Sequence, residues 1–341
     1  CNLDTRLLEH YENELNYLRD MGGEFAAAYP KIASRLGMEG VEVLDPYVER
    51  LLEGVAFLSA RVQLELQLQY PNFTSNLLEI IYPHYLAPTP SMMIAAFKPD
   101  VTNSAVKSGY VLPRHSVLRS RLTEGEQTAC EFRTATEMTM WPIEVTEAEY
   151  IDGRGELVAA GVAAGTSARA GIRVRLRRSD GEAISDLAMD KLTLYLSNEA
   201  GNSWPLLELL CTQVQGLVAR STDRRADWHM PLPEGRIVQR GFESDEALLP
   251  TPRQVFDGYR LLQEFFAMPE RFRFVELQGL GQALERAKGP EMDIYILLRE
   301  GMSEVATVVT PEVFTLNAVP AINLFEKRCD RVQIAPHDTE H

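Results

Sequence analysis

The sequence predicts an α+β multidomain protein, with an amino-terminal helical region, a β-rich body of sandwich or barrel type, and a mixed α/β segment. Apolar residues recur at helical spacing up to about residue 90 of the 341 residues. Strand-like alternation and turn residues then dominate up to about residue 250, after which helix and strand patterns mix. We therefore expect three regions, 1–90, 91–250 and 251–341, with the last continuing beyond residue 341.

The chain up to Gly37 predicts two helices. Apolar residues recur at helical spacing over Leu7–Met21, and Gly22-Gly23 are expected to end this first helix, because glycine weakens a helix interior. A second helix is expected from Glu24 to Leu36, with Gly37 as its stop.

A third helix is expected from Asp45 to Tyr70. Asp45 is a suitable N-cap, Pro46 suits the first helical position, and Pro71 should end the helix because proline lacks the N–H that a helix needs. A shorter helix capped by Thr74 is expected to follow.

The third helix is apolar on more than one side, and such a helix needs more than one neighbour. We expect some of these neighbours to be other chains. The candidate residues for a partner interface are Val48, Leu51, Leu52, Val55, Phe57, Leu58, Val62 and Leu66.

The stretch "YPHYLAPTPSM" follows the helical region and predicts a rigid joint. Pro83 should end the last helix, and Pro88 and Pro90 should hold the chain extended. Tyr82 and Tyr85 are expected to anchor the joint by apolar contacts.

From residue 91 onward short strands are expected in "MMIAAF", "GIRVRLRR" and "KLTLYLS", one or two more in "CEFRTATEMTMWPIEVTEAEY", and a helix in "SWPLLELLCTQV". In "GIRVRLRR" apolar residues alternate with Arg173, Arg175 and Arg177, which predicts a half-buried strand with a charged face toward solvent. An anion-binding ladder and a protein contact are the alternatives for these arginines.

The last region predicts a helix in "TPRQVFDGYRLLQEFFAMP", followed by strand, helix and strand in "FRFVELQGLGQALERAKGPEMDIYILL". The turn Gly279-Leu280-Gly281, with Glu300 further on, has the outline of a dinucleotide-binding unit. Leu284 occupies the place of the third glycine of that motif, so an ordinary strand–turn–helix–strand segment is favoured.

Composition argues against several classes of function. The formal net charge of −15 disfavours phosphate backbones and anionic lipid, so we expect neither nucleic-acid binding nor direct membrane insertion. Sparse cysteines, Cys1, Cys130, Cys211 and Cys329, suit a reducing compartment and a cytoplasmic protein.

Local motifs for catalysis or metal binding are missing from the sequence. The histidines, His10, His84, His115, His229, His337 and His341, form no HExxH or HxH pattern, and no GxSxG occurs. His84 is best interpreted as a hydrogen-bonded residue of the proline-rich turn. We therefore expect no catalytic residue, no metal and no cofactor.

Four blocks, in this order, resemble the TssF family (ImpG/VasA), the baseplate wedge subunits of bacterial type VI secretion. They are "DPYVERLLEGVAFLSARVQ" with "YPNFTSNLLEIIYPHYLAPTPSM", then "CEFRTATEMTMWPIEV", "FDGYRLLQEFFAMPERFRFVELQGL" and "LNAVPAINLFEKRCDRVQI". Because family members are longer and the chain lacks an initiator methionine, we expect the larger, amino-terminal part of such a subunit.

The resemblance implies a structural, non-catalytic role. TssF subunits assemble with TssG, commonly two TssF around one TssG, and the wedges join TssK and TssE around the spike at the base of a contractile sheath. The resemblance places them at the cytoplasmic face of the inner membrane. The alternatives are a wedge protein of a phage-derived contractile particle and, from a different class, a nucleotide-binding enzyme using Gly279 and Gly281.

Overall fold

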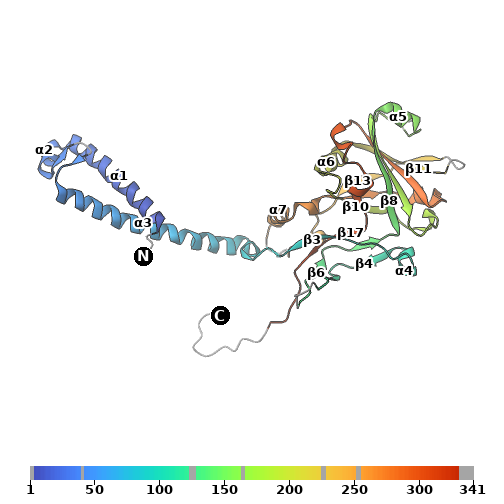
Figure 1. Ribbon diagram of the computed structural model, residues 1–341, viewed down its shortest axis with the longest axis horizontal. Helices are drawn as coiled ribbons and strands as arrows, with labels where there is room; N and C mark the ends of the chain where they lie inside the picture. The colour runs from blue at the N-terminus through green and yellow to red at the C-terminus, as the bar shows by residue number, and fades with distance from the viewer. Residues whose placement is uncertain are drawn as a thin grey trace. The chain divides into compact units, whose positions relative to one another are not determined.

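The computed structural model divides the chain into two compact units, Cys1–Pro88 and Thr89–His341 (Figure 1). It describes residues 4–39, 42–122, 128–162, 166–223, 228–250 and 255–329. Cys1, His337, His341 and the start and end of the predicted last region lie outside these residues. The first unit is mainly helical and the second is rich in sheets, which confirms the predicted α+β class. Among the helices described, none is both long and apolar enough to cross a bilayer.

The first unit is a helical hairpin. Its elements are α1 (Thr5–Ala28), α2 (Pro30–Ala33), a 3₁₀ turn (Ser34–Leu36), the short strands β1 (Met38–Glu39) and β2 (Glu42–Val43), α3 (Pro46–Ile81) and a further 3₁₀ turn (Pro83–Leu86). The Asp45 carboxylate accepts a hydrogen bond from the backbone N–H of Tyr47 at 2.9 Å, and Pro46 takes the first helical position. Both observations confirm the predicted start of the third helix.

Gly22 and Gly23 lie inside α1, so the prediction that they end the first helix is wrong. Gly22 is buried, and a residue without a side chain lets a neighbouring segment approach its backbone closely. Packing at this point offsets a propensity cost of about 1 kcal/mol for each glycine relative to alanine. The predicted second helix from Glu24 to Leu36 is also wrong, because residues 24–28 belong to α1, which ends at Tyr29 before Pro30. Only the short α2 and a 3₁₀ turn follow, and Gly37 (φ 64°) ends that turn at the predicted position.

Helix α3 continues through Pro71 for 36 residues, so the predicted break and the separate helix capped by Thr74 are wrong. Proline leaves the carbonyl of Gln67 without its helical donor, but Gln67 is exposed and water can satisfy that carbonyl. The Thr74 hydroxyl donates to the carbonyls of Tyr70 at 3.2 Å and Pro71 at 3.0 Å and so bonds within the same helix. The result is one helix of about 54 Å.

Antiparallel sheets build the second unit. A five-stranded sheet has the order β12 (His229–Leu232), β11 (Val214–Ser221), β15 (Glu291–Leu298), β9 (Ala170–Arg178) and β8 (Ile143–Asp152). A four-stranded sheet has the order β13 (Arg236–Gln239), β14 (Phe274–Gln278), β10 (Lys191–Leu196) and β16 (Phe314–Thr315). A second four-stranded sheet has the order β3 (Met92–Ala96), β17 (Ala318–Ile322), β6 (Glu131–Thr134) and β5 (Val117–Arg119). Two further strands pair with each other, β4 (Tyr110–Leu112) and β7 (Met138–Met140).

The helices of this unit are short. They are α4 (Ser104–Lys107), α5 (Arg154–Ala159), α6 (Trp204–Thr212), α7 (Asp257–Ala267) and α8 (Gly281–Arg286). Helices α6, α7 and α8 and the strands β3, β9, β10, β14 and β15 fall where the sequence predicts them.

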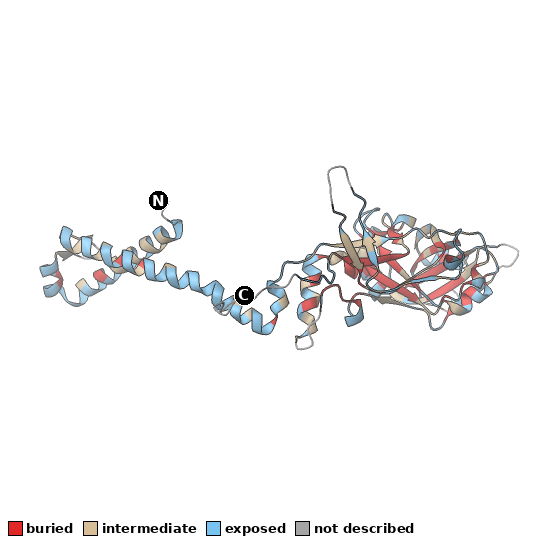
Figure 2. Ribbon diagram, turned by 90° about the horizontal axis from the view of Figure 1, so that it is seen from below, coloured by how far each residue is buried: buried red, intermediate tan, exposed pale blue. Residues whose placement is uncertain are grey.

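One large core joins the five-stranded sheet to the sheet that contains β10 and β14. In β9 the apolar residues Ile172, Val174 and Leu176 are buried, so the predicted period of two is confirmed. Leu194 of β10 and Leu277 of β14 enter the same core from the other sheet. Figure 2 shows the buried residues concentrated in these sheets. Two open sheets that share a core correspond to the predicted sandwich and not to a barrel.

Strands from either side of residue 250 share the same sheets. β14 lies between β13 and β10, and β15 lies between β11 and β9. The boundary expected at residue 250 therefore does not separate two sets of sheets. Between Cys130 and Tyr150 the chain enters three strands, β6, β7 and β8, where one or two were expected. β17 pairs along the whole of β3, from Ala318 opposite Ala96 to Ile322 opposite Met92.

Candidate partner interface

Helices α1 and α3 pack antiparallel against each other. Arg19 contacts Glu49 at 3.1 Å, and the His10 Nε2 atom lies 2.8 Å from Oε1 of Gln67. The buried residues of α3 are Ala56 and Ala60, which are 0% exposed and lie one turn apart. Small side chains at this spacing let two helix backbones approach closely. The hairpin is therefore held along a narrow strip of α3, and most of the circumference of this helix remains uncovered.

The predicted interface candidates divide into two sets. Val48 and Leu52 are half-buried, and the exposed set comprises Leu51, Val55, Phe57, Leu58, Val62 and Leu66. The exposed fraction reaches 70% at Leu51 and 61% at Val62. At about 100° per residue, Ala60 lies roughly 160° around the helix from Leu58, so these residues point away from α1. Phe57 falls outside this row, and Figure 2 shows the larger part of α3 in the colour of exposed residues.

The row continues in both directions beyond the predicted candidates. Exposed apolar residues at matching spacing are Tyr47, Phe73, Leu77 and Ile80, and Ile80 is 82% exposed. We call the row of exposed residues Tyr47, Leu51, Val55, Leu58, Val62, Leu66, Phe73, Leu77 and Ile80 the α3 stripe. Its last three members were missed because Pro71 was expected to end the helix. The sequence did contain a signal for them, because the successive spacings from Leu66 to Phe73, Leu77 and Ile80 are seven, four and three residues, which is helical spacing.

The α3 stripe extends over about 50 Å of helix. An apolar surface of this length indicates an interaction site, because monomeric proteins rarely expose contiguous apolar patches beyond a few hundred Å². Burial of one such leucine or valine side chain contributes about 1.5–3 kcal/mol. Several of these residues together can offset the roughly 4–15 kcal/mol that association costs in lost freedom. The stripe contains no ionisable group except the Tyr47 hydroxyl, so its chemistry is that of helix packing.

The proline-rich stretch after α3 places its aromatic rings together. Tyr82 is buried, and its ring centroid lies 6.4 Å from that of His84 and 6.4 Å from that of Tyr85. Pro83 opens the 3₁₀ turn, so a proline does follow the end of α3. Tyr85 is 58% exposed, so of the two tyrosines only Tyr82 is anchored by burial. The role of this stretch as a rigid joint stays a prediction.

The dinucleotide-like segment does not form a dinucleotide-binding unit. Its two strands, β14 and β15, belong to different sheets, whereas the motif requires neighbouring parallel strands. Gly279 has φ 77°, and a Cβ there would lie 2.8 Å from the backbone of Glu234, so the turn itself requires a glycine. The N–H of Gly281 is already bonded to the Asp190 carboxylate at 3.1 Å.

The arginines of β9 are paired with carboxylates of the neighbouring strands. Arg173 contacts Glu149 at 2.8 Å, Arg177 contacts Glu144 at 2.6 Å, and Arg175 contacts Glu147 at 2.7 Å. Arg175 also contacts Asp293 of β15 at 2.7 Å, and this hydrogen bond is the main cause that raises the pKa of Arg175. Guanidinium groups that already hold carboxylates are poor anion ligands, which disfavours the anion-ladder alternative.

A cavity of about 480 Å³ lies in the second unit beside β10 and β14. Several of its charged groups already have partners: Arg240 contacts Glu246 at 2.6 Å, and Glu276 accepts a hydrogen bond from Gln278 at 2.6 Å. None of the described residues that line it is a histidine or a cysteine. Over the described part of the chain, no three His, Cys, Asp or Glu side chains gather as metal ligands would. The α3 stripe is therefore the stronger candidate site.

Comparison with known proteins gives the family directly. The sequence model of the family described as "Type VI secretion system, TssF" matches residues 3–341. A curated relative from Pseudomonas aeruginosa, the type VI secretion system component TssF1, is 44% identical over 339 residues. That match covers 99% of this chain and 54% of the relative, so the chain spans about half the length of the protein it matches.

A solved structure has a similar fold. It is a cryo-electron microscopy structure of the TssK-TssF-TssG baseplate subcomplex of the type VI secretion system. The match has a TM-score of 0.62 and 27% sequence identity and covers 82% of this chain and 49% of the other. Sequence family, curated relative and fold agree, and the chain belongs to the TssF family of type VI secretion proteins.

Proposed function

We propose that this chain is part of a structural subunit of the type VI secretion baseplate, and that its α3 stripe packs against helices of TssG. The observation that carries the proposal is the stripe itself, a row of apolar side chains that α1 leaves uncovered. The solved TssK-TssF-TssG subcomplex supports TssG and TssK as partners. TssE, the spike and a second copy of the subunit complete the proposed wedge.

The geometry of the hairpin suits a helical bundle. A helix of about 54 Å on which Ala56 and Ala60 are the buried residues has room for further helices around it. An apolar stripe without charges fits a permanent interface, because such interfaces resemble a protein core.

We propose further that the subunit works without catalysis, on the cytoplasmic side of the inner membrane. Carboxylates and guanidiniums of the second unit are engaged with one another, as at Arg175–Asp293 and Arg240–Glu246, which suits a scaffold. The net charge of −15 disfavours adsorption to anionic lipid, so contact with the membrane complex would run through proteins.

Co-expression of the full-length subunit with TssG tests the proposal, with purification through a tag on one partner and mass determination by light scattering. A complex with two copies of the subunit per TssG is expected. Leu58→Ser combined with Val62→Ser should abolish it, because two polar groups would enter the core of the interface. Val158→Ser is the matched control, since Val158 is 57% exposed on α5 of the other unit. A wild-type subunit that never co-purifies with TssG, or a double variant that binds normally, would overturn the proposal.

A further inference from the structure

Helix α7 carries its charges inward and its aromatic residues outward. Arg260 and Glu264, one turn apart, are 1% and 0% exposed, whereas Phe266 is 82% exposed and Leu262 58%. A surface helix ordinarily buries its apolar stripe and exposes its charges. The reversed arrangement requires two separate explanations, one for each face.

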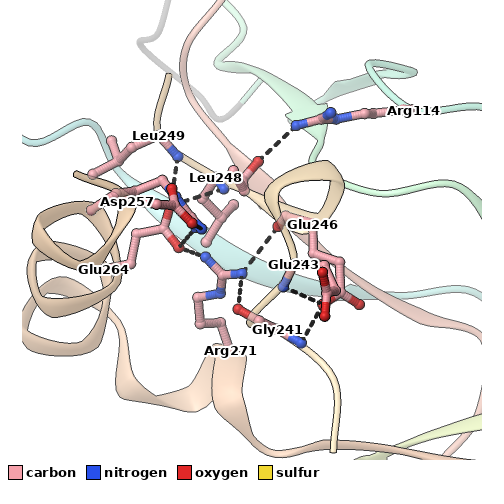
Figure 3. Close-up of polar contacts among 11 residues, drawn as sticks. Arg114, Gly241, Glu243, Glu246, Leu248, Leu249, Asp257, Glu264 and Arg271 are labelled. Carbon is pink, nitrogen blue, oxygen red and sulfur yellow. Dashed lines mark hydrogen bonds and ion pairs between the residues drawn. The ribbon is translucent and has the colours of Figure 1, made fainter. Parts of the chain in front are cut away.

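The inner face is fixed by a buried ion cluster around Glu264 (Figure 3). One carboxylate oxygen of Glu264 accepts hydrogen bonds from the backbone N–H groups of Leu248 at 3.1 Å and Leu249 at 2.9 Å. The other oxygen pairs with the guanidinium groups of Arg260 and Arg271. This cluster ties α7 to the loop before it and to the turn after it, so the orientation of the helix follows from the charges.

The guanidinium of Arg271 is charged at neutral pH although it is buried. Burial, and then the neighbouring charge of Arg260, lower the pKa of Arg271 to about 10, which is still far above neutrality. Arg271 also donates to the carbonyls of Gly241 at 2.6 Å and Glu246 at 3.0 Å. The cluster is therefore ionic under physiological conditions, and α7 has no freedom to turn its apolar side inward.

The outer face carries two groups of aromatic rings with Leu262 between them. Tyr259, Leu262 and Phe266 stand at positions i, i+3 and i+7, on the side of the helix opposite Arg260 and Glu264. Phe256 extends the row through an edge contact with Tyr259, with ring centroids 5.7 Å apart. At the other end the rings continue through Phe265, Phe272 and Phe242, with successive centroids 5.8 and 5.3 Å apart. We call the exposed residues Phe256, Tyr259, Leu262, Phe265 and Phe266 the α7 face.

The composition of the α7 face is that of an interface centre. Aromatic side chains bury about 150–250 Å² each and dominate the energy of protein contacts. Their exposure to water is unfavourable in an isolated unit, and the inner cluster gives no reason for aromatic residues on the outside. Four rings and a leucine on three turns of helix fit the flank of a second helix.

The charges around the α7 face indicate the character of its partner. In residues 241–250 and 255–272 the basic side chains described, Arg260 and Arg271, are both 1% exposed. The accessible charges of the same segments are acidic: Glu243 and Asp245 are exposed, Glu270 is half-buried, and Asp257 is half-buried and already paired with Arg260. Arg240, which directly precedes these segments, is paired with Glu246 at 2.6 Å. An aromatic surface with an acidic rim attracts a basic partner and is repelled by the anionic surface of a membrane.

We propose that the α7 face is a docking surface for an amphipathic helix of a protein partner, with aliphatic residues on its apolar side and Lys or Arg at its flanks. This surface is distinct from the α3 stripe, lies in the other unit, and goes beyond the proposed function. Aliphatic side chains would pack on the rings, and the basic flanks would meet the carboxylates of the rim.

Site-specific photocrosslinking in the full-length subunit tests this proposal. p-Benzoylphenylalanine replaces Phe266 in cells that produce the whole secretion machinery, and crosslinked peptides are sequenced by mass spectrometry. The expected product joins residue 266 to one protein segment with aliphatic residues at helical spacing and basic flanks. A synthetic peptide of that segment should bind the purified subunit at least about tenfold more weakly after Leu262→Ser with Phe266→Ser, as for a hot-spot pair.

Controls distinguish this proposal from the previous one. The same crosslinker at Val158 should give no such product, and the Leu262→Ser, Phe266→Ser variant should keep the unfolding transition of the wild type. A crosslinker at Leu58 of α3 reports separately on TssG. Products to lipid, to the subunit's own chain or to an acidic segment, or no product at residue 266, would overturn the α7 proposal whatever Leu58 reports.

Discussion

Replacement of Glu264 by glutamine should strongly destabilise the second unit. The carboxylate is 0% exposed and holds two buried guanidiniums and two backbone N–H groups at once. Glutamine has the same shape but no charge, and its amide offers one acceptor oxygen in place of two. Either the backbone N–H groups or the guanidiniums must then face an NH₂ group that cannot accept a hydrogen bond.

The magnitude follows from the charges left behind. Arg260 keeps Asp257, at 2.7 Å, but Arg271 keeps the carbonyls of Gly241 and Glu246 and the Phe272 ring at 4.9 Å, and these are neutral groups. Removal of one partner from a buried ion pair costs about 3–5 kcal/mol, because the other charge stays buried without compensation. For a unit of this size each kcal/mol lowers the Tm by about 2–4 °C, so we expect a decrease of roughly 10 °C.

Tryptophan fluorescence during urea unfolding is a selective assay. Trp141, Trp204 and Trp228 all lie in the second unit, so the signal does not report on the helical hairpin. Glu285→Gln on the exposed side of α8 is the matched control, with an expected change within about 0.5 kcal/mol. Addition of Arg271→Met to Glu264→Gln should recover part of the loss, because the uncompensated charge is removed.

The reasoning would be refuted by a Glu264→Gln variant whose unfolding free energy lies within about 1 kcal/mol of the wild type. A double variant that is less stable than Glu264→Gln alone would refute the explanation by uncompensated charge. It would show instead that the hydrogen bonds of Arg271 to the backbone carbonyls carry the stability.

Three further predictions follow from the same contacts. Gly279→Ala should lower the free energy of unfolding in urea by more than about 1 kcal/mol, because Gly279 has φ 77° and an added Cβ would meet the backbone of Glu234. Saturating nicotinamide nucleotides should leave the Tm of the wild type unchanged, because the turn does not form a nucleotide site. Hydrogen bonding to Arg260 lowers the pKa of Asp257 in the folded state. The Asp257 carboxylate therefore stabilises the fold above its unfolded pKa of about 4, and this stabilisation is lost as the pH falls below that value. Between about pH 5 and pH 3 the unfolding free energy of the Asp257→Asn variant should therefore decrease less than that of the wild type. Pro71→Ala should stabilise the hairpin by about 1–3 kcal/mol, measured as a higher transition in far-ultraviolet circular dichroism, and an unchanged transition would contradict the account of Pro71 as a tolerated defect.

Features that depend on neighbouring residues were predictable from the sequence. The Asp45-Pro46 start of α3 rests on a side chain and a backbone N–H two residues apart. The alternation in β9 rests on strand geometry, which every residue of the strand shares. Such signals are local, and tertiary packing did not override them.

Features decided by distant contacts were not predictable in the same way. Whether Gly22 ends a helix depends on what packs against it, and whether Pro71 breaks one depends on whether water reaches the freed carbonyl. Helix α7 is the clearest case, since its pattern alone would put the aromatic residues in the core. The carboxylate of Glu264 decides the orientation through the loop at Leu248 and Leu249, which no helical period reveals.

The pairing of β3 with β17 has a consequence for synthesis on the ribosome. Met92 lies opposite Ile322, so β3, the first strand of the second unit, cannot pair with β17 until the ribosome has synthesised almost the whole unit. At about 5–20 residues per second this delay lasts on the order of ten seconds or more, during which β3 has an unpaired edge. Contacts between such distant residues also slow folding. Nascent chains of this subunit should therefore associate with chaperones until residue 322 has left the exit tunnel, and premature release before that point should produce aggregates in place of a partly folded unit.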